Sequence, residues 1–142
     1  MKGESQMFLQ AISIWGIIDI ILIVVMLYIL GNQLYLWYQG RRVAHFLENQ
    51  EFRHGMHVAQ IIDLRDKDNF DAGHIMGARN VPYAQFKIMK ESIRKDMPVY
   101  LYDQGKSLST RIAVRLHKDG YTDIYILKNG FDKWDGRVKK RS

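Results

Sequence analysis

Two polar segments of the chain follow apolar, strand-like runs and carry the side chains best suited to chemistry. Asp63 and Arg65 lie at the end of the run that begins at Val58. The second segment follows the run 99–102 directly and consists of Asp103, Gln104, Gly105, Lys106, Ser107 and Leu108. In open sheets, ligands bind where the carboxyl ends of parallel strands meet. The sequence therefore predicts that Asp63, Arg65 and the 103–108 loop line one pocket.

The chain of 142 residues contains no cysteine, which limits the chemistry of that pocket. Thiolate nucleophiles, persulfide carriers, disulfides and Cys-ligated metals are excluded. A carboxylate such as Asp103 is a nucleophile in some phosphoryl transfers, but Asp103-Gln104-Gly105 offers no second acid to help hold a metal ion. His54 and His57 have no third ligand in sight, so we expect no metal site and no cofactor.

Strands that alternate with helices must position these side chains. Runs rich in β-branched and aromatic residues predict strands at 58–64, 79–82, 99–102 and 123–127. A short helical piece is expected at 68–72, closed by Gly73, and a longer helix is expected to be capped by Ser107 and to end at Gly120. This order predicts an α/β fold with a mainly parallel sheet flanked by helices.

Two motifs carry a resemblance to a known family. Ile62-Asp63-Leu64-Arg65, Phe70 and the segment 73–82 are similar to I-D-x-R, F and G-H-I-x-G-A-x-N-x-P. A second series runs from the 99–102 strand through Ser109, Ile112, Ala113, Leu116 and Gly120 to Leu127, Gly130 and Trp134. Together they make residues 45–136 resemble a rhodanese-like (thiosulfate sulfurtransferase-like) domain.

The resemblance implies a loop whose chemistry has changed. In the family, a sulfur-carrying Cys follows the third strand, within a C-x-x-G-x-R-S loop. Here Asp103 stands at the Cys position, Lys106 at the Gly position and Leu108 at the Arg position. The loop of such a domain turns backbone N–H groups toward an anion at a helix start. We expect the Asp103 carboxylate to fill that place, stay charged and be a poor nucleophile toward thiosulfate.

No catalytic residue is therefore expected. The favoured interpretation is a non-catalytic module that binds a protein or a small anion and regulates it. The alternative is a sulfurtransferase-type enzyme, transferring thiosulfate or persulfide sulfur at an atypical site. We expect Asp63 and Arg65 to serve the scaffold more than a substrate, because ion pairs at strand ends often have architectural roles.

Residues 1–40 predict an N-terminal membrane anchor. The 23 residues from Phe8 to Leu30 are mostly apolar, and a helix of that length reaches about 34 Å, enough for a hydrocarbon core of about 30 Å. Residues 34–38 have the aromatic character of a membrane interface. A cleaved signal peptide fits less well, because no A-x-A-like site follows the run. Residues 41–52 are expected to connect the anchor to the domain.

Charge predicts the partners and the orientation. Arg41 and Arg42 follow the apolar run and only Lys2 precedes it, so the positive-inside rule places the domain on the cytoplasmic side of the cell membrane as a single-pass protein. The net charge of +6 and the basic tail 137–142 favour an anionic lipid leaflet as partner. Nucleic acid is not expected, because no base-reading motif is present. Asp19 either pairs two such helices or lies near the outer interface.

Overall fold

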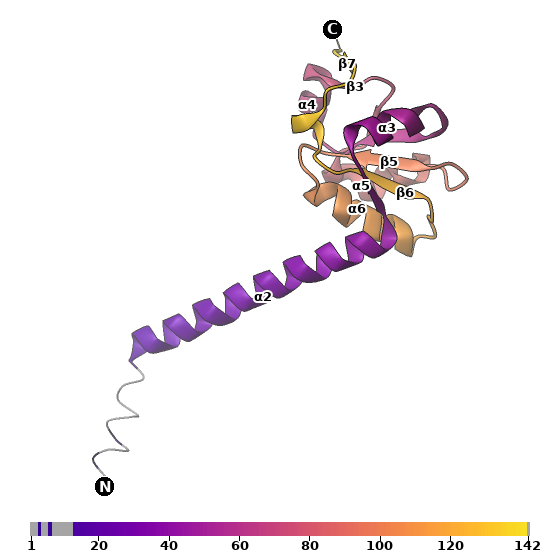
Figure 1. Ribbon diagram of the computed structural model, residues 1–142. Helices are drawn as coiled ribbons and strands as arrows, with labels where there is room; N and C mark the ends of the chain where they lie inside the picture. Colours follow the sequence, from indigo (N-terminus) through magenta and orange to yellow (C-terminus); the bar gives the residue numbers. More distant parts are fainter. Residues whose placement is uncertain (1–2, 4–5, 7–12, 142) are drawn as a thin grey trace. The chain divides into compact units, whose positions relative to one another are not determined.

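The long helix α2 (Ile14–Val43) crosses the boundary between two compact units of the chain, Met1–Tyr35 and Leu36–Ser142. The computed structural model describes residues 3, 6 and 13–141 (Figure 1). Helix α2 has 30 residues and is a candidate membrane span by its length and composition. Its length of about 45 Å exceeds the thickness of a hydrocarbon core.

The helix differs from its expected bounds at both ends. Residues 8–12 lie outside the described residues, and the helix continues past Leu30 through Gly31, Asn32 and Gln33 to Val43. Gly costs a helix about 1 kcal/mol relative to Ala and Asn costs less, so the apolar turns on either side outweigh these interruptions. Asp19 lies exposed on this helix.

Five parallel strands form the sheet of the second unit, in the order β1-β6-β5-β2-β4. Their bounds are β1 His45–Leu47, β2 Gln60–Asp63, β4 Arg79–Asn80, β5 Val99–Tyr102 and β6 Ile124–Leu127. The strands expected at 99–102 and 123–127 are found almost as predicted, and those at 58–64 and 79–82 are shorter. This confirms the α/β fold with a mainly parallel sheet.

Helices cover both faces of the sheet, with α5 and α6 on one side and α3 on the other (Figure 1). The α-helices of this unit are α3 Asn49–Gly55, α4 Lys67–Ala72, α5 Phe86–Met89 and α6 Ser107–Lys118. Short 3-10 turns occupy η1 Met56–Val58, η2 Tyr83–Gln85, η3 Lys90–Ser92 and η4 Phe131–Lys133. A separate antiparallel pair joins β3 His74–Ile75 to β7 Val138–Lys139.

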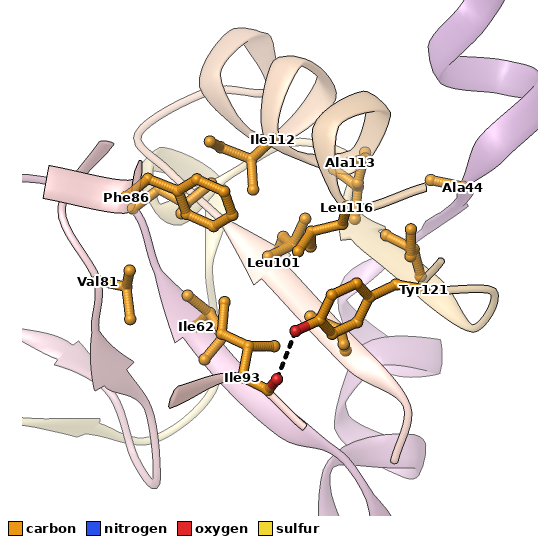
Figure 2. Packing of buried hydrophobic residues seen from close by; sticks show 14 residues of the cluster. Ala44, Ile62, Val81, Phe86, Ile93, Leu101, Ile112, Ala113, Leu116 and Tyr121 are labelled. Atoms are coloured by element: carbon orange, nitrogen blue, oxygen red, sulfur yellow. Dashed lines mark hydrogen bonds between the residues drawn. The ribbon is translucent and has the colours of Figure 1, made fainter. Parts of the chain in front are cut away.

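Alternating side chains of the central strands divide the core into two clusters. Ile62 and Leu101 face α5 and α6, where they pack with Phe86, Ile112 and Leu116 (Figure 2). The neighbouring side chains Ile61, Tyr100 and Tyr102 face the opposite side, where they pack with Phe52 of α3. A strand places successive side chains on opposite faces, so apolar residues at consecutive positions fit a sheet covered on both sides.

The segments at the two ends of the domain contribute strands and helix to the fold, which the sequence did not suggest. Residues 41–52, expected to be a connector, contain β1 and the start of α3, whose Phe52 is fully buried. The basic tail 137–142 contributes β7, and Arg141 N–H donates to the Asp71 carbonyl at 3.0 Å. Within the second unit, Gly40 of α2 is buried, and a Cβ there would meet Thr110 of α6.

Candidate functional site

The carboxyl ends of β2 and β5 place the two predicted polar segments next to each other. These strands are parallel neighbours, with Asp63 opposite Tyr102. Arg65 follows the first strand and Asp103 the second. The two segments touch where Arg65 Nη1 donates to Gln104 Oε1 at 3.5 Å. The chain thus brings Asp63, Arg65 and the 103–108 loop to one edge of the sheet.

The carboxylate of Asp103 is turned into the start of helix α6. Its Oδ2 accepts the Leu108 backbone N–H at 3.2 Å, and its Oδ1 accepts the Ser109 backbone N–H at 3.4 Å. Oδ1 also accepts the Ser109 hydroxyl at 2.5 Å. Asp103 is only 4% exposed and Ser109 is fully buried. Both carboxylate oxygens are therefore occupied by groups of the same chain.

These contacts make Asp103 the side-chain cap of α6. Capping side chains accept N–H groups of the second and third helical residues, and Leu108 and Ser109 hold those positions in a helix that begins at Ser107. The expectation that Ser107 caps the helix is wrong. Ser107 is the first helical residue, and Lys106, at the cap position, makes no side-chain cap hydrogen bond.

The backbone of the loop is fastened to the segment after β6. Phe131 N–H donates to the Asp103 carbonyl at 2.9 Å, and Asp132 N–H donates to the Gln104 carbonyl at 3.3 Å. The Gln104 side-chain amide also donates to the Asp132 carboxylate. Gly130 has a φ of 67°, and a Cβ there would run into the carbonyl oxygens of Gln104 and Gly105. Only glycine allows this approach of backbone to backbone.

Asp63 and Arg65 form a buried ion pair that is already saturated with protein contacts. Arg65 Nη2 lies 2.7 Å from Asp63 Oδ2 and 2.6 Å from the Gly73 carbonyl, and the Arg65 plane stacks over the Phe131 ring at 4.0 Å. Burial opposes the charge of Arg65, but the hydrogen bond and the charge of Asp63 outweigh it and raise its pKa. Both residues serve to hold the sheet edge together.

Tyr102 ties the same edge to β3 and gives the fold a pH dependence. Its hydroxyl is fully buried and accepts the Ile75 N–H at 3.0 Å. Burial, followed by the charge of Asp63, raises the pKa of Tyr102 far above its usual range. The folded state therefore holds the phenol proton more tightly than the unfolded chain, so stability is full below about pH 10 and falls as the pH rises above it.

We predict that Tyr102→Phe flattens the loss of stability above pH 10. The variant has no phenol proton to release at this position on unfolding, although losing the contact to Ile75 lowers its stability at pH 8. Urea unfolding of the full chain in a mild detergent at pH 8–11 measures both effects. Tyr83→Phe, at a partly exposed tyrosine of η2 outside helix α2, provides the control. Equal slopes for the unaltered chain and Tyr102→Phe would contradict the assignment.

The remaining candidates have structural or solvent-facing positions. His74 Nδ1 lies 2.8 Å from the Phe70 carbonyl, and its ring stacks on Phe70 with centroids 3.8 Å apart. His54 and His57 are exposed, as are Gly105, Lys106 and Ser107 of the loop. Among the residues that the structure describes, no three His, Asp or Glu side chains gather as metal ligands.

The predicted site ended at Leu108, so Ser109 counted as part of the family motif but not of the site, and Asp132 was not connected with the loop. Ser109 has a recognisable signal, because it precedes Ile112 and Ala113 by three and four residues and so lies on the buried face of α6. A buried hydroxyl requires a partner. Asp132 carries no comparable signal, since its contact with Gln104 joins positions 28 residues apart.

At this site the Asp103 carboxylate occupies the place of a bound anion, and no sulfur nucleophile is present. The helix N-terminus, which favours negative charge, faces a carboxylate of its own chain. The loop backbone is held by a second segment, and the neighbouring arginine is held by Asp63. An incoming anion at this place would meet the Asp103 carboxylate, and the N–H groups of Leu108 and Ser109 would already be bound.

Comparisons with known proteins extend this description. The sequence model of the family described as "Rhodanese-like domain" matches residues 48–137. The Bacillus subtilis protein YqhL, described as uncharacterized, is 43% identical over 125 residues, which are 88% of this chain and 96% of that protein. The Coxiella burnetii protein named thiosulfate sulfurtransferase GlpE is 31% identical over 74 residues, or 52% of this chain and 69% of that protein.

Solved structures agree with the fold. A rhodanese-like domain protein from Staphylococcus aureus superposes with a TM-score of 0.63 at 20% identity, covering 69% of this chain and 99% of that one. The rhodanese-like domain of an Anabaena protein gives 0.59 at 24% identity, with 67% and 78% covered. These likenesses show the fold, and the match of the family over most of the second unit shows the relationship. The chain belongs to the rhodanese-like domain family.

Proposed function

We propose that this chain is a membrane-tethered rhodanese-like module that does not transfer sulfur and instead acts by binding a protein or an anion. The observation that carries the proposal is the position of Asp103. Its carboxylate accepts two helix N–H groups and a hydroxyl at the place where the resemblance puts the sulfur-carrying Cys. The loop therefore retains its helix start, while the reactive sulfur atom is missing and the N–H groups of Leu108 and Ser109 already have an acceptor within the chain.

Sulfur transfer from thiosulfate requires a nucleophile that takes the outer sulfur and releases sulfite. A thiolate does this and becomes a persulfide, which a second acceptor then empties. A carboxylate bound by three donors lacks the polarisable sulfur lone pairs that this step needs, and the chain has no cysteine elsewhere. Thiosulfate sulfurtransferase is the name of the Coxiella burnetii relative, whereas this chain differs from the family motif at Asp103, Lys106 and Leu108.

The tether rests on helix α2 and its flanking charges. The likeness to the Bacillus subtilis protein covers 125 residues, more than the family domain alone, and so includes part of the N-terminal region. Arg41 and Arg42 follow the apolar part of α2 and lie over the rings of Trp37 and Tyr38. This pairing of cations with aromatic side chains suits a membrane interface. We propose that the domain lies on the cytoplasmic side, where the anionic lipid leaflet attracts the basic residues of 137–142.

The orientation is tested by cysteines introduced one at a time at Lys2 and Ser142. Because the natural chain has none, each thiol is a unique label site. In intact cells, a membrane-impermeant maleimide is expected to label Lys2→Cys and to spare Ser142→Cys until the membrane is opened. The reverse pattern would overturn the topology.

The absence of sulfur transfer is tested with a thiosulfate-to-cyanide assay on the full chain in mild detergent. We expect no thiocyanate above the protein-free rate. Asp103→Cys is the companion variant, because the amides of Leu108 and Ser109 would stabilise a thiolate at that place. It is expected to accumulate cyanide-labile sulfur, which shows that the assay detects chemistry at this loop. Thiocyanate formation by the unaltered chain would overturn the proposal in favour of an atypical sulfurtransferase.

A further inference from the structure

A cavity of about 780 Å³ lies apart from the Asp103 loop. It is bordered by the end of α3 and η1, the beginning of β2, the turn after β3 and the segment 134–137. None of the loop residues 103–108 lines it, nor do Asp63 and Arg65. Its volume falls within the range of small-molecule sites, about 300–1,000 Å³.

The floor of the cavity is apolar and adaptable. Its larger apolar lining residues are Met56, Ile61, Met76 and Trp134. The Trp134 ring is fixed, because it packs edge-on against Phe52 with centroids 5.7 Å apart and its N–H points to the Arg137 carbonyl at 3.4 Å. Methionine side chains fill irregular spaces and suit ligands of varied shape. Such a floor favours a flat or branched apolar group.

The rim of the cavity carries an excess of positive charge. Arg53, His57 and Arg137 line it together with one acid, Asp135. Asp135 is engaged by Arg53 at 3.5 Å. Within residues 13–141, no side chain pairs with the guanidinium of Arg137 or with the imidazole of His57. The unpaired guanidinium of Arg137 therefore favours an anion, because an anion placed beside it gains charge-assisted hydrogen bonds.

We propose that this cavity binds a small organic anion in which an aromatic or branched apolar body carries one carboxylate or sulfonate group. The apolar body lies on Met56, Met76 and Trp134, and the anionic group faces Arg137 at the rim. The inference rests on the proposed binding function and moves its anion site from the Asp103 loop to a separate cavity of the domain. Fixed polar groups at the edge of an apolar cavity are the usual source of such specificity.

The test is photolabelling of the full chain in mild non-ionic detergent with 4-benzoylbenzoate, an aromatic carboxylate that couples to nearby C–H groups under ultraviolet light. Saturable label is expected on the tryptic peptides 54–65 and 68–79, which contain Met56 and Met76. Arg137→Gln is expected to reduce this label about fivefold, the scale of one partly exposed charge contact. Arg111→Gln, on the exposed face of α6, is the matched control and leaves it unchanged.

Two outcomes would overturn the inference. The first is a label that spreads along α2, or a label that Arg137→Gln does not reduce. Either result would mean that the probe binds to apolar surface regardless of charge. The other is label displaced by an acidic peptide and not by free 1-naphthoate, which would assign the cavity to a protein partner. The neutral analogue 4-methylbenzophenone, expected to label without dependence on Arg137, separates charge from apolar contact. None of these results changes the sulfur-transfer assay, so the two proposals fail separately.

Discussion

Arg65→Met is expected to lower the free energy of unfolding by about 3–5 kcal/mol, because it strands a buried charge. The change leaves the Asp63 carboxylate, which is fully buried, without its cationic partner. It also removes the donor to the Gly73 carbonyl and the stacking on Phe131. Methionine keeps the unbranched stem of the arginine side chain as far as the Nε position, so the loss reports the stranded Asp63 charge together with the missing guanidinium contacts.

Urea unfolding of the full chain in mild detergent, followed by fluorescence, measures this effect. Arg94→Met is the matched control, because Arg94 pairs with Asp96 at 2.6 Å with the same two-residue spacing but on the exposed surface. Its unfolding midpoint is expected to stay close to that of the unaltered chain. The double variant Asp63→Asn, Arg65→Met is expected to recover part of the loss, because no charge is then stranded. Equal losses in Arg65→Met and Arg94→Met would contradict a structural role for the buried pair.

Asp103→Ala is expected to destabilise the chain by about 2–4 kcal/mol, from the loss of a helix cap and from the stranding of a buried hydroxyl. The backbone N–H groups of Leu108 and Ser109 lose their acceptor, and the Ser109 hydroxyl, fully buried, loses its partner. In an active member of the family, replacing the nucleophile removes activity. Here the residue at that place is expected to act on folding.

Asp66→Ala is the matched control for a carboxylate cap. Asp66 accepts the Asn69 N–H at the exposed start of α4, and its loss is expected to cost about 1 kcal/mol. Asp103→Asn should fall between the unaltered chain and Asp103→Ala, because its amide keeps one acceptor but turns a donor toward the Leu108 N–H. The same urea unfolding experiment ranks all three variants. An Asp103→Ala variant as stable as the unaltered chain would show that the carboxylate does not cap α6.

Much of the fold could be predicted because its central elements have strong local signals. The strands at 99–102 and 123–127 combine β-branched and aromatic residues with clear ends, and α6 shows its apolar period. Strand β1 was missed because His45-Phe46-Leu47 is short and gains its partner β6 from the far end of the chain. Strand β7 was missed because Val138 and Lys139 lie among basic residues that suggest a solvated tail.

The location of the site could be predicted from the sequence, but its hydrogen bonds could not. The register of the motifs placed Asp103 beside the start of α6, and the charge of a helix N-terminus indicated what the carboxylate would contact. Which side chain caps α6, Asp103 or the expected Ser107, depends on how the loop turns between residues 103 and 107. That turn is set by Gly130, Phe131 and Asp132, which no local pattern links to the loop.

The close approach of Gly130 to the loop backbone also determines the direction of loop N–H groups that Gly130 does not contact. The carbonyls of Asp103 and Gln104 accept N–H groups of residues 131 and 132, and the carbonyls of Gln104 and Gly105 lie against Gly130. In a planar trans peptide, the carbonyl and the following N–H point in opposite directions. The N–H groups of Gln104, Gly105 and Lys106 must therefore point away from residues 130–132. A side chain at position 130 would clash with the carbonyl oxygens of Gln104 and Gly105 and displace these peptide planes, so a residue some 25 positions away along the chain controls where the loop N–H groups point.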